Sequence, residues 1–285
     1  MKGDEERMKI GVFDSGYGGL TVLARCLEAV EPQGKAPTFV YYADSDYAPY
    51  GERSVAEVQA LTQRAIRFLI EEEQVALVII ACNTATSLAI EALRAECSIP
   101  IIGIEPAIKP ASQHREAGEM ILVTATPLMT QSERLNRRIQ ELGLENRVER
   151  LALPGLVQIA EHPTLTWEEK QVAAKDYLEA MIPQQLSRRC GSVVLGCTHF
   201  PIFLSAYQAV FESRGHSKVY FADGSEGVAR AFVQALNRHS ADNSSTDATV
   251  TIRFYQSSRL LEGAEEIRFQ QLLNQIQQSF SAERK

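Results

Sequence analysis

The sequence lacks long apolar runs and an excess of positive charge. No hydrophobic stretch approaches the ~20 residues that a membrane-spanning helix needs. The 29 Lys and Arg residues are outnumbered by 36 Asp and Glu residues, which gives a formal net charge of -7. This balance argues against a general nucleic-acid binder, because phosphate contacts need clustered Lys and Arg. A small anionic substrate is still compatible with it, since a few local donors can outweigh a distant negative surface.

Targeting and metal-binding motifs are also missing. The first eight residues, MKGDEERM, are charged and have no apolar core, so we expect no secretory signal and no membrane contact. A cytoplasmic location follows, where thiols stay reduced. The five cysteines are Cys26, Cys82, Cys97, Cys190 and Cys197. None forms a C-x-x-C pair, and no histidine has zinc-ligand spacing from such a pair, so no structural metal site is expected.

Short β-branched runs alternate with longer helical patterns. We expect strands at residues 10–13, 38–42, 76–81, 100–104, 120–123, 192–195 and 218–221. Ser54 with Glu57, and Thr166 with Glu169, have the spacing of capping boxes that begin helices. The polar segment 238–247 is typical of a loop, and a last strand at 248–255 and a final helix follow it. This alternation predicts an α/β protein with mostly parallel, doubly wound sheets, whose ligands bind beyond the carboxyl ends of the strands.

One short pattern occurs twice. Residues 78–84 read VIIACNT, and residues 193–199 read VVLGCTH. Each is an apolar strand, a small residue, a cysteine and a polar pair. Two equivalent strand ends, each with one thiol, indicate two similar halves that face each other across a cleft.

Cys82 is expected where a buried strand meets a helix, with Asn83 and Thr84 as N-cap residues. The positive end of the helix dipole lowers the pKa of a thiol there, and the N–H groups of the turn can hold a carboxylate. A buried, inert cysteine is the commoner role of such a residue. Cys197 has the same placement, followed by Thr198 and His199, a titratable partner. Each cysteine alone favours the inert role, but the two together favour catalysis.

Three further segments carry candidate residues. Residues 11–19, GVFDSGYGG, form a glycine-rich turn that is neither a P-loop nor a dinucleotide fingerprint, and it brings Asp14 and Ser15 to a strand end. Asp14 is interpreted either as a simple cap or as a charge beside the thiols. Tyr50 and Gly51 lie in a loop, and Glu161 lies at an expected helix end, where a solvated carboxylate is the ordinary interpretation.

These segments together resemble the bacterial glutamate racemases of the aspartate/glutamate racemase superfamily. The matching stretches are IGVFDSGYGGLTVL (10–23), APYGERS (48–54), VIIACNTATS (78–87), PIIGIEPAIKPA (100–111), LPGLVQIAE (153–161) and VLGCTHFP (194–201). The ACNTA and LGCTHFP pair is highly specific. The resemblance weakens after Asp223, and the C-terminal arm has no clear match.

The resemblance implies interconversion of L- and D-glutamate for peptidoglycan synthesis, without pyridoxal phosphate, metal or another cofactor. It implies two α/β domains, which we place at 1–105 with 217–285 and at 106–216, with the active site in the cleft between them. Cys82 and Cys197 are then the acid/base residues, supported by Asp14 and His199. The implied substrate-binding residues are Asp14, Ser15, Tyr50, Gly51, Asn83, Thr84, Thr198 and His199. Glu161 lies behind His199, and a homodimer is compatible with the sequence.

Several alternatives stay open at this point. Family members often carry a Thr-x-x-Thr pattern with one substrate-contacting threonine, and here either Thr126 or Thr130 fits. The chain can also be a racemase of another acidic amino acid such as aspartate, because the motifs do not measure the depth of the side-chain pocket. A decarboxylase or isomerase with one catalytic cysteine fits two intact motifs poorly. A two-domain module that only binds a small anion is the non-catalytic alternative.

Overall fold

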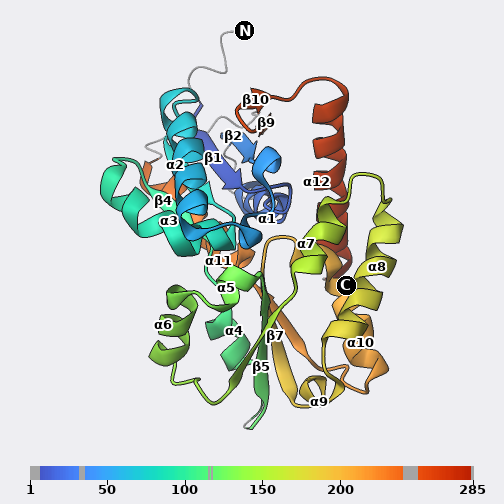
Figure 1. Cartoon of the computed structure of the whole chain (residues 1–285). Helices are drawn as coiled ribbons and strands as arrows, with labels where there is room; N and C mark the ends of the chain where they lie inside the picture. Colours follow the sequence, from blue (N-terminus) through green and yellow to red (C-terminus); the bar gives the residue numbers. More distant parts are fainter. Residues whose placement is uncertain (1–6, 32–35, 115, 117, 240–249, 284–285) are drawn as a thin grey trace. The chain divides into compact units, whose positions relative to one another are not determined.

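Two compact units make up the chain. The computed structural model describes residues 7–31, 36–114, 116, 118–239 and 250–283. Met1–Glu105 with Ser225–Lys285 forms the first unit, and Pro106–Gly224 forms the second. Figure 1 follows this division by colour, since blue and red segments share the first unit while green and yellow segments make up most of the second.

The first unit contains a six-stranded sheet in the order β10-β9-β2-β1-β3-β4. Its strands are β1 (Lys9–Asp14), β2 (Thr38–Ala43), β3 (Leu77–Ile80), β4 (Ile101–Gly103), β9 (Thr251–Gln256) and β10 (Arg259–Leu260). All neighbours pair in parallel except β10 with β9. Every side chain of β1 after Lys9 is buried, as are all of those in β2 and β3. Such continuous apolar strands are typical of a parallel sheet covered on both faces.

The second unit contains a four-stranded parallel sheet in the order β6-β5-β7-β8. Its strands are β5 (Met120–Ala125), β6 (Val148–Ala152), β7 (Cys190–Gly196) and β8 (Tyr220–Asp223). In both units the first strand of the series lies between the second and the third. The second strand is therefore added on one side of the first strand, and the third strand on its other side. This change of side gives a switch point between β1 and β3 in the first sheet, and between β5 and β7 in the second. Ligands of doubly wound sheets bind at such a switch point, beyond the carboxyl ends of the strands.

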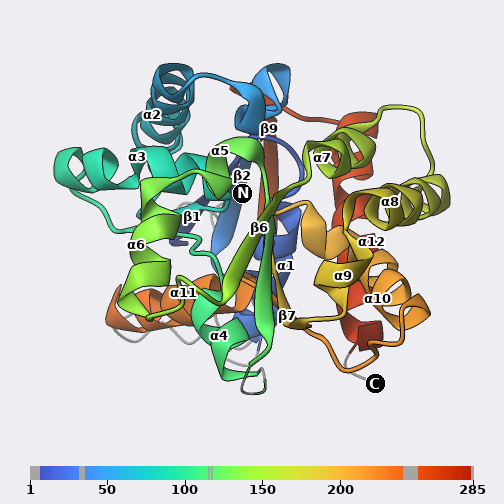
Figure 2. The same cartoon turned by 60° about the horizontal axis from the view of Figure 1, so that its bottom comes forward.

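Helices cover both faces of each sheet. The first unit has α1 (Leu20–Val30), α2 (Val55–Glu71), α3 (Asn83–Glu96), α11 (Ser225–His239) and α12 (Ala264–Glu283), with the short turns η2 (Ser45–Tyr47) and η3 (Tyr50–Glu52). The second has α4 (Ile108–Gln113), α5 (Pro127–Thr130), α6 (Glu133–Glu141), α7 (Pro154–Glu161), α8 (Trp167–Met181), α9 (Gln184–Ser187), η4 (Phe200–Phe203) and α10 (Leu204–Ser213). In the first unit α2 packs against α3, and α1 packs against α11 and α12. In the second, α8 packs against α7 and α10, as Figure 2 shows from another side.

Local sequence signals explain several helix ends. The two expected capping boxes are present: Ser54 Oγ accepts from Glu57 N at 3.3 Å, and Thr166 Oγ1 accepts from Glu169 N at 3.2 Å. Each glutamate in turn accepts from the N-cap N–H. Gly143 follows α6 with a φ of 63°. Glycine adopts this left-handed backbone without steric cost, so it ends the helix as the sequence predicts.

The C-terminal arm completes the first unit. β9 adds to the sheet beside β2, and α12 packs on α1. A buried carboxylate, Glu73, ties this arm to the end of α2: Arg253 Nη1 lies 2.7 Å from Glu73 Oε2, and the Tyr255 hydroxyl donates to the same carboxylate. Burial and this hydrogen bond raise the pKa of Tyr255 to about 12. The strand expected at 248–255 is thus β9.

Two expectations need correction, and part of a third lies outside the described residues. Residues 217–224 were placed with the first domain, but β8 pairs with β7, so the second unit extends to Gly224. The sequence analysis also contained no strand at β6, whose residues Glu149 and Arg150 are exposed. Of the loop expected at 238–247, residues 240–247 lie outside the described part of the chain, and α11 runs to His239.

No helix in the described part of the chain combines the length and the apolar character needed to cross a bilayer.

Candidate active site

Cys82 occupies the end of β3, at the switch point of the first sheet. It is the N-cap residue of α3, and its Sγ accepts a hydrogen bond from Ala85 N at 3.5 Å. The prediction that Asn83 and Thr84 are the N-cap residues is wrong, because both lie in the first turn of the helix. The correction places the sulfur itself at the positive end of the helix dipole, where a thiolate is stabilised.

Asp14 is the last residue of the neighbouring strand β1, and Ser15 follows it. In the β1–β3 register Phe13 pairs with Ile80, so Ser15 comes level with Cys82. The Cys82 thiol lies 3.7 Å from Ser15 Oγ and donates to it. Asp14 is fully buried, and its Oδ1 accepts from Gly16 N at 2.9 Å. The glycine-rich turn therefore does bring these two residues to the strand end, as the sequence predicts.

Asn83 and Thr84 are buried beside Cys82, with 5% and 3% of their surfaces exposed. The Asn83 amide nitrogen, Nδ2, has no hydrogen-bond partner among the described residues. A buried donor without a partner costs free energy. Such a group next to a strand-end thiol is therefore ready to bind an acceptor on a ligand.

Tyr50 and Gly51 lie buried in η3, and a carboxylate that the sequence analysis did not single out fixes Tyr50. The Tyr50 hydroxyl donates to Asp44 Oδ2 at 2.6 Å, and Arg64 Nη2 lies 3.2 Å from Asp44 Oδ1. Asp44 is fully buried directly after β2, and its N–H donates to Asp14 O at 3.0 Å. Burial, together with the Asp44 charge and hydrogen bond, raises the pKa of Tyr50 far above its usual range. The hydroxyl is thus held as a donor to Asp44.

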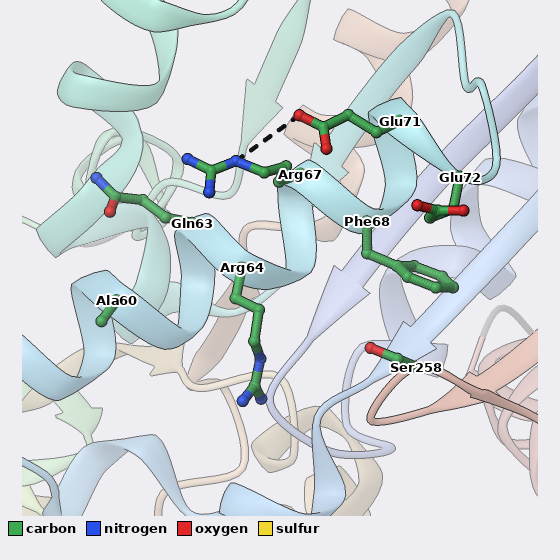
Figure 3. A pocket seen from close by; sticks show the side chains of 8 residues that line it. All are labelled: Ala60, Gln63, Arg64, Arg67, Phe68, Glu71, Glu72 and Ser258. Carbon is green, nitrogen blue, oxygen red and sulfur yellow. Dashed lines mark ion pairs between the residues drawn. The ribbon is translucent and has the colours of Figure 1, made fainter.

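A surface hollow adjoins this network. Its volume is about 340 Å³, and α2 lines it with Arg64, Phe68 and an ion pair between Arg67 Nε and Glu71 Oε1 at 3.8 Å, drawn as a dashed line in Figure 3. None of the predicted site residues lines this hollow. It is therefore separate from the residues that surround Cys82.

Cys197, Thr198 and His199 follow β7 in the second unit and are all buried. His199 Nδ1 lies 3.7 Å from Cys197 Sγ, and His199 Nε2 lies 2.7 Å from Glu161 Oε1. Glu161 is the last residue of α7. The carboxylate, the imidazole and the thiol are therefore linked in series, and the carboxylate orients the ring.

The environment of His199 favours its charged form. Burial by itself lowers the pKa of His199, but its hydrogen bonds to Cys197 and Glu161, with their negative charges, outweigh burial and raise this pKa well above 6.5. An imidazolium between a carboxylate and a sulfur can act as a proton donor or as the partner of a thiolate.

The two threonines left open by the sequence lie in different positions. Ala125 pairs with Gly196 in the β5–β7 register, so Thr126 comes level with Cys197 as Ser15 does with Cys82. Thr126 is the N-cap of α5. The Thr130 hydroxyl instead donates to Pro127 O within α5, at 2.8 Å. The sequence interpretation left both threonines open; an alignment of the two cysteine motifs together with the strands that precede them is the signal that could have pointed to Thr126.

The remaining cysteines have unreactive surroundings. All five lie in the described part of the chain, and none forms a disulfide. Burial raises the pKa of Cys26 far above its ordinary value and that of Cys190 to about 12, and burial also raises the pKa of Cys97. Within the described residues, no three His, Cys, Asp or Glu side chains are grouped so that they could hold a metal ion.

The predicted residues thus gather in two groups, one in each unit. Asp14, Ser15, Cys82, Asn83 and Thr84 lie at the carboxyl ends of β1 and β3, with Tyr50 linked to them through Asp44. Cys197, Thr198, His199 and Glu161 lie at the carboxyl end of β7 and on α7.

Comparisons with known proteins bear on what these groups do. Residues 10–232 match the model of the Asp/Glu/Hydantoin racemase family. The chain is 40% identical to a glutamate racemase of Campylobacter curvus over 237 residues, which cover 81% of this chain and 84% of that protein. The crystal structure of glutamate racemase from Campylobacter jejuni is 28% identical with a TM-score of 0.70, covering 94% of this chain and 98% of that one.

A third relative is the Escherichia coli glutamate racemase, solved in complex with L-glutamate and the activator UDP-MurNAc-ala. It is 25% identical with a TM-score of 0.72, and the match covers 95% of both chains. The family match over residues 10–232 includes both strands that precede the cysteines. The chain therefore belongs to the Asp/Glu/Hydantoin racemase family, and with it to the isomerases.

Proposed function

We propose that this protein interconverts L- and D-glutamate, with Cys82 and Cys197 as the two acid/base groups and without a cofactor. The observation that carries the proposal is the equivalence of the two thiols. Each follows the third strand of its unit, and the first four strands of the two units have the same order. Each thiol also lies level with a hydroxyl residue that directly follows the first strand. The names of the relatives support glutamate as the substrate.

The reaction needs acid and base on opposite faces of the α-carbon. One thiolate takes the α-proton, so that the C–H bond breaks and an S–H bond forms. The other thiol gives its proton to the opposite face, and its sulfur is left as the thiolate. Solvent exchange restores the starting protonation, and the two sulfurs exchange roles in the reverse direction. No electrons are gained or lost, which is consistent with a reaction that needs no redox partner.

The residues around Cys82 are proposed to bind the substrate and stabilise charge. N–H groups at the start of α3 and Asn83 Nδ2, which has no hydrogen-bond partner within the described part of the chain, can donate to the substrate carboxylate, where negative charge develops as the α-proton leaves. Asp14 supplies a negative charge for the substrate ammonium or assists proton transfer. Ser15 and Thr84 add hydroxyls beside the sulfur. Tyr50, which is hydrogen-bonded to Asp44, lines the substrate site together with Gly51.

The residues around Cys197 are proposed to move its proton. His199 supports the thiolate as an imidazolium, and Glu161 holds the ring. Thr198 and Thr126 complete substrate binding on this side. Because Thr126 was not part of the predicted site, its inclusion rests on the register that places it beside Cys197.

We also propose that the protein works in the cytoplasm and that the D-glutamate it forms is used for peptidoglycan synthesis. The Escherichia coli relative was solved with the activator UDP-MurNAc-ala, and this supports the proposal. Light scattering of the purified protein tests whether the chain forms the homodimer that its sequence allows.

Circular dichroism of L- and D-glutamate, and of both enantiomers of aspartate, tests the proposal without added cofactor. The wild type is expected to racemise glutamate only, while Cys82→Ala and Cys197→Ala are expected to lose racemisation. Cys97→Ala is the matched control, because this partly exposed cysteine lies outside both groups. Racemisation of aspartate would contradict glutamate as the only substrate. If the optical activity of every amino acid stayed unchanged, the protein would instead be a module that binds a small anion without catalysis.

A further inference from the structure

The position of Glu161 depends on a short helix. α7 has eight residues, and Glu161 is the last of them. Isolated helices of this length are unstable in water, and their ends fray first. A carboxylate on the last turn therefore keeps its 2.7 Å distance to His199 Nε2 only if another element holds that turn.

The neighbouring helix α8 holds α7 at both ends. Near its start, Lys170 Nζ donates to Ala160 O at 2.5 Å, one residue before Glu161. Seven residues later on α8, the Tyr177 hydroxyl accepts from Gly155 N at 3.2 Å. Because seven residues make about two helical turns, Lys170 and Tyr177 lie on the same face of α8. The two helices thus run antiparallel, with a hydrogen bond between them near each end.

Both contacts are closely fitted. Lys170 is buried, with 7% of its surface exposed, although a lysine is rarely buried to this degree. Its ammonium lies at the C-terminal end of α7, where a cation satisfies the last carbonyls and the helix dipole. At the other end, a Cβ on Gly155 would lie 2.5 Å from the Tyr177 ring, so the ring packs directly on the backbone.

Gln171, the residue after Lys170, holds the segment that directly follows His199. Gln171 Nε2 donates to Ile202 O at 3.0 Å, and Gln171 Oε1 accepts from Ser205 Oγ at 3.2 Å. Ile202 belongs to η4, which directly follows His199. Two adjacent residues of α8 therefore fix the backbone that carries Glu161 and the backbone that carries His199.

We propose that Lys170 is a positioning residue, which fixes the end of α7 so that Glu161 holds His199 against Cys197. Lys170 acts through the carboxylate and does not touch the substrate. Its importance for turnover rests on the function proposed above, but its effect on His199 does not. The two can therefore be tested separately.

The test replaces Lys170 and follows the His199 imidazole by NMR titration in the full-length protein. Lys170→Met keeps the apolar stem and removes the ammonium, and Lys170→Arg retains a cationic donor. Glu161→Gln gives the reference value for a His199 that has lost its carboxylate. Lys175→Met is the matched control, since Lys175 lies on the same helix with an exposed side chain, 3.8 Å from Glu179. The His199 signal is assigned from its absence in His199→Gln.

The sign of the shift decides between positioning and simple charge. Loss of a nearby cation by itself raises a histidine pKa, whereas loss of the Glu161 contact lowers it. We expect Lys170→Met to lower the His199 pKa toward the Glu161→Gln value, and Lys170→Arg and Lys175→Met to leave it near the wild-type value. A folded Lys170→Met protein with an unchanged or raised His199 pKa would overturn the proposal.

Turnover and a milder variant complete the test. We expect kcat of Lys170→Met to fall about tenfold or more in both directions, with KM changed less than about twofold, because substrate binding is unaffected. Tyr177→Phe removes only the hydroxyl on α8 that contacts the start of α7. This variant takes the place of Lys170→Met in the test if Lys170→Met does not fold. It is expected to lower the His199 pKa by less, and no decrease would contradict the proposal. If the wild type does not racemise glutamate, the proposed function fails while the titration still tests Lys170.

Discussion

The two thiols have unlike neighbours. Cys82 contacts a hydroxyl and a helix N–H, which are neutral groups, whereas Cys197 contacts an imidazole backed by a carboxylate. In the proposed reaction, proton transfer through Cys197 therefore depends on the protonation of His199, whereas proton transfer through Cys82 depends on the dipole of α3 and on Asp14. The same difference makes His199 a source of pH-dependent stability.

We expect His199 to stabilise the fold more at low pH than at high pH. Its pKa in the folded protein is raised well above the ordinary 6.5, so the folded state binds the proton more tightly than the unfolded chain. The contribution is fully present below pH 6.5 and is lost as pH rises through the folded pKa. Urea unfolding of wild type and His199→Gln at a series of pH values measures it. The difference in unfolding free energy should shrink as pH rises, and a growing difference would contradict this assignment.

Tyr50 offers a second test at this scale. In Tyr50→Phe, the buried Asp44 loses its 2.6 Å donor, and we expect the free energy of unfolding to fall by about 1–2 kcal/mol and KM to rise. Tyr42→Phe is the control, because the Tyr42 hydroxyl is bonded to Ser258 at 2.9 Å and lies outside the proposed site. Steady-state kinetics of both variants provide the check, with an equal effect on KM in the two variants speaking against a role for Tyr50.

At the scale of elements, the close approach of α7 and α8 predicts an unequal effect of two similar substitutions. Gly155→Ala places a Cβ against the Tyr177 ring, and we expect a loss of about 1–2 kcal/mol in unfolding free energy together with lower kcat. Gly227→Ala, in α11, meets no atom within 4 Å and should be neutral or stabilising by about 0.5–1 kcal/mol. Chemical denaturation of both proteins measures the difference. Equal stability of the two variants would remove the argument for a tight α7–α8 contact.

The elements also indicate what sequence alone can predict. Buried strands such as β3 are continuous apolar runs, and the capping boxes at Ser54 and Thr166 are local, so both were predicted. β6 is an edge strand whose exposed charges hide its pattern. Asp44 and Lys170 were missed for another reason. Their partners belong to other elements, Tyr50 in η3 and Ala160 in α7, and only the folded chain shows that Asp44 and Lys170 are buried.

At the scale of the whole molecule, the first unit depends on its C-terminal arm. Arg253 on β9 pairs with Glu73, whose side chain is 8% exposed, and Lys9 Nζ lies 3.9 Å from the same carboxylate. Arg253→Met leaves this buried charge with fewer partners, so we expect a loss of about 1–2 kcal/mol in unfolding free energy. Arg67→Met, which breaks the exposed pair with Glu71, should cost less than about 0.5 kcal/mol. Urea denaturation compares them, and equal losses would mean that Glu73 does not anchor the arm.

The two units repeat one arrangement of strands. The repeated pattern in the sequence, with Cys82 in one copy and Cys197 in the other, corresponds to β3 and β7, the third strand of each series. The sequence analysis could predict this equivalence because the pattern is local. It could not place the boundary of the second unit, because β8 is assigned by its pairing with β7 and not by its own residues.

The most direct measurement is racemisation of L-glutamate in heavy water, stopped at low conversion and analysed by mass spectrometry of both enantiomers. If one thiol removes the α-proton and another supplies a solvent-derived deuteron, the D-glutamate formed carries one deuterium at the α-carbon while unreacted L-glutamate stays protiated. D-glutamate that keeps its original α-proton would show a single base acting on both faces, and would contradict the account.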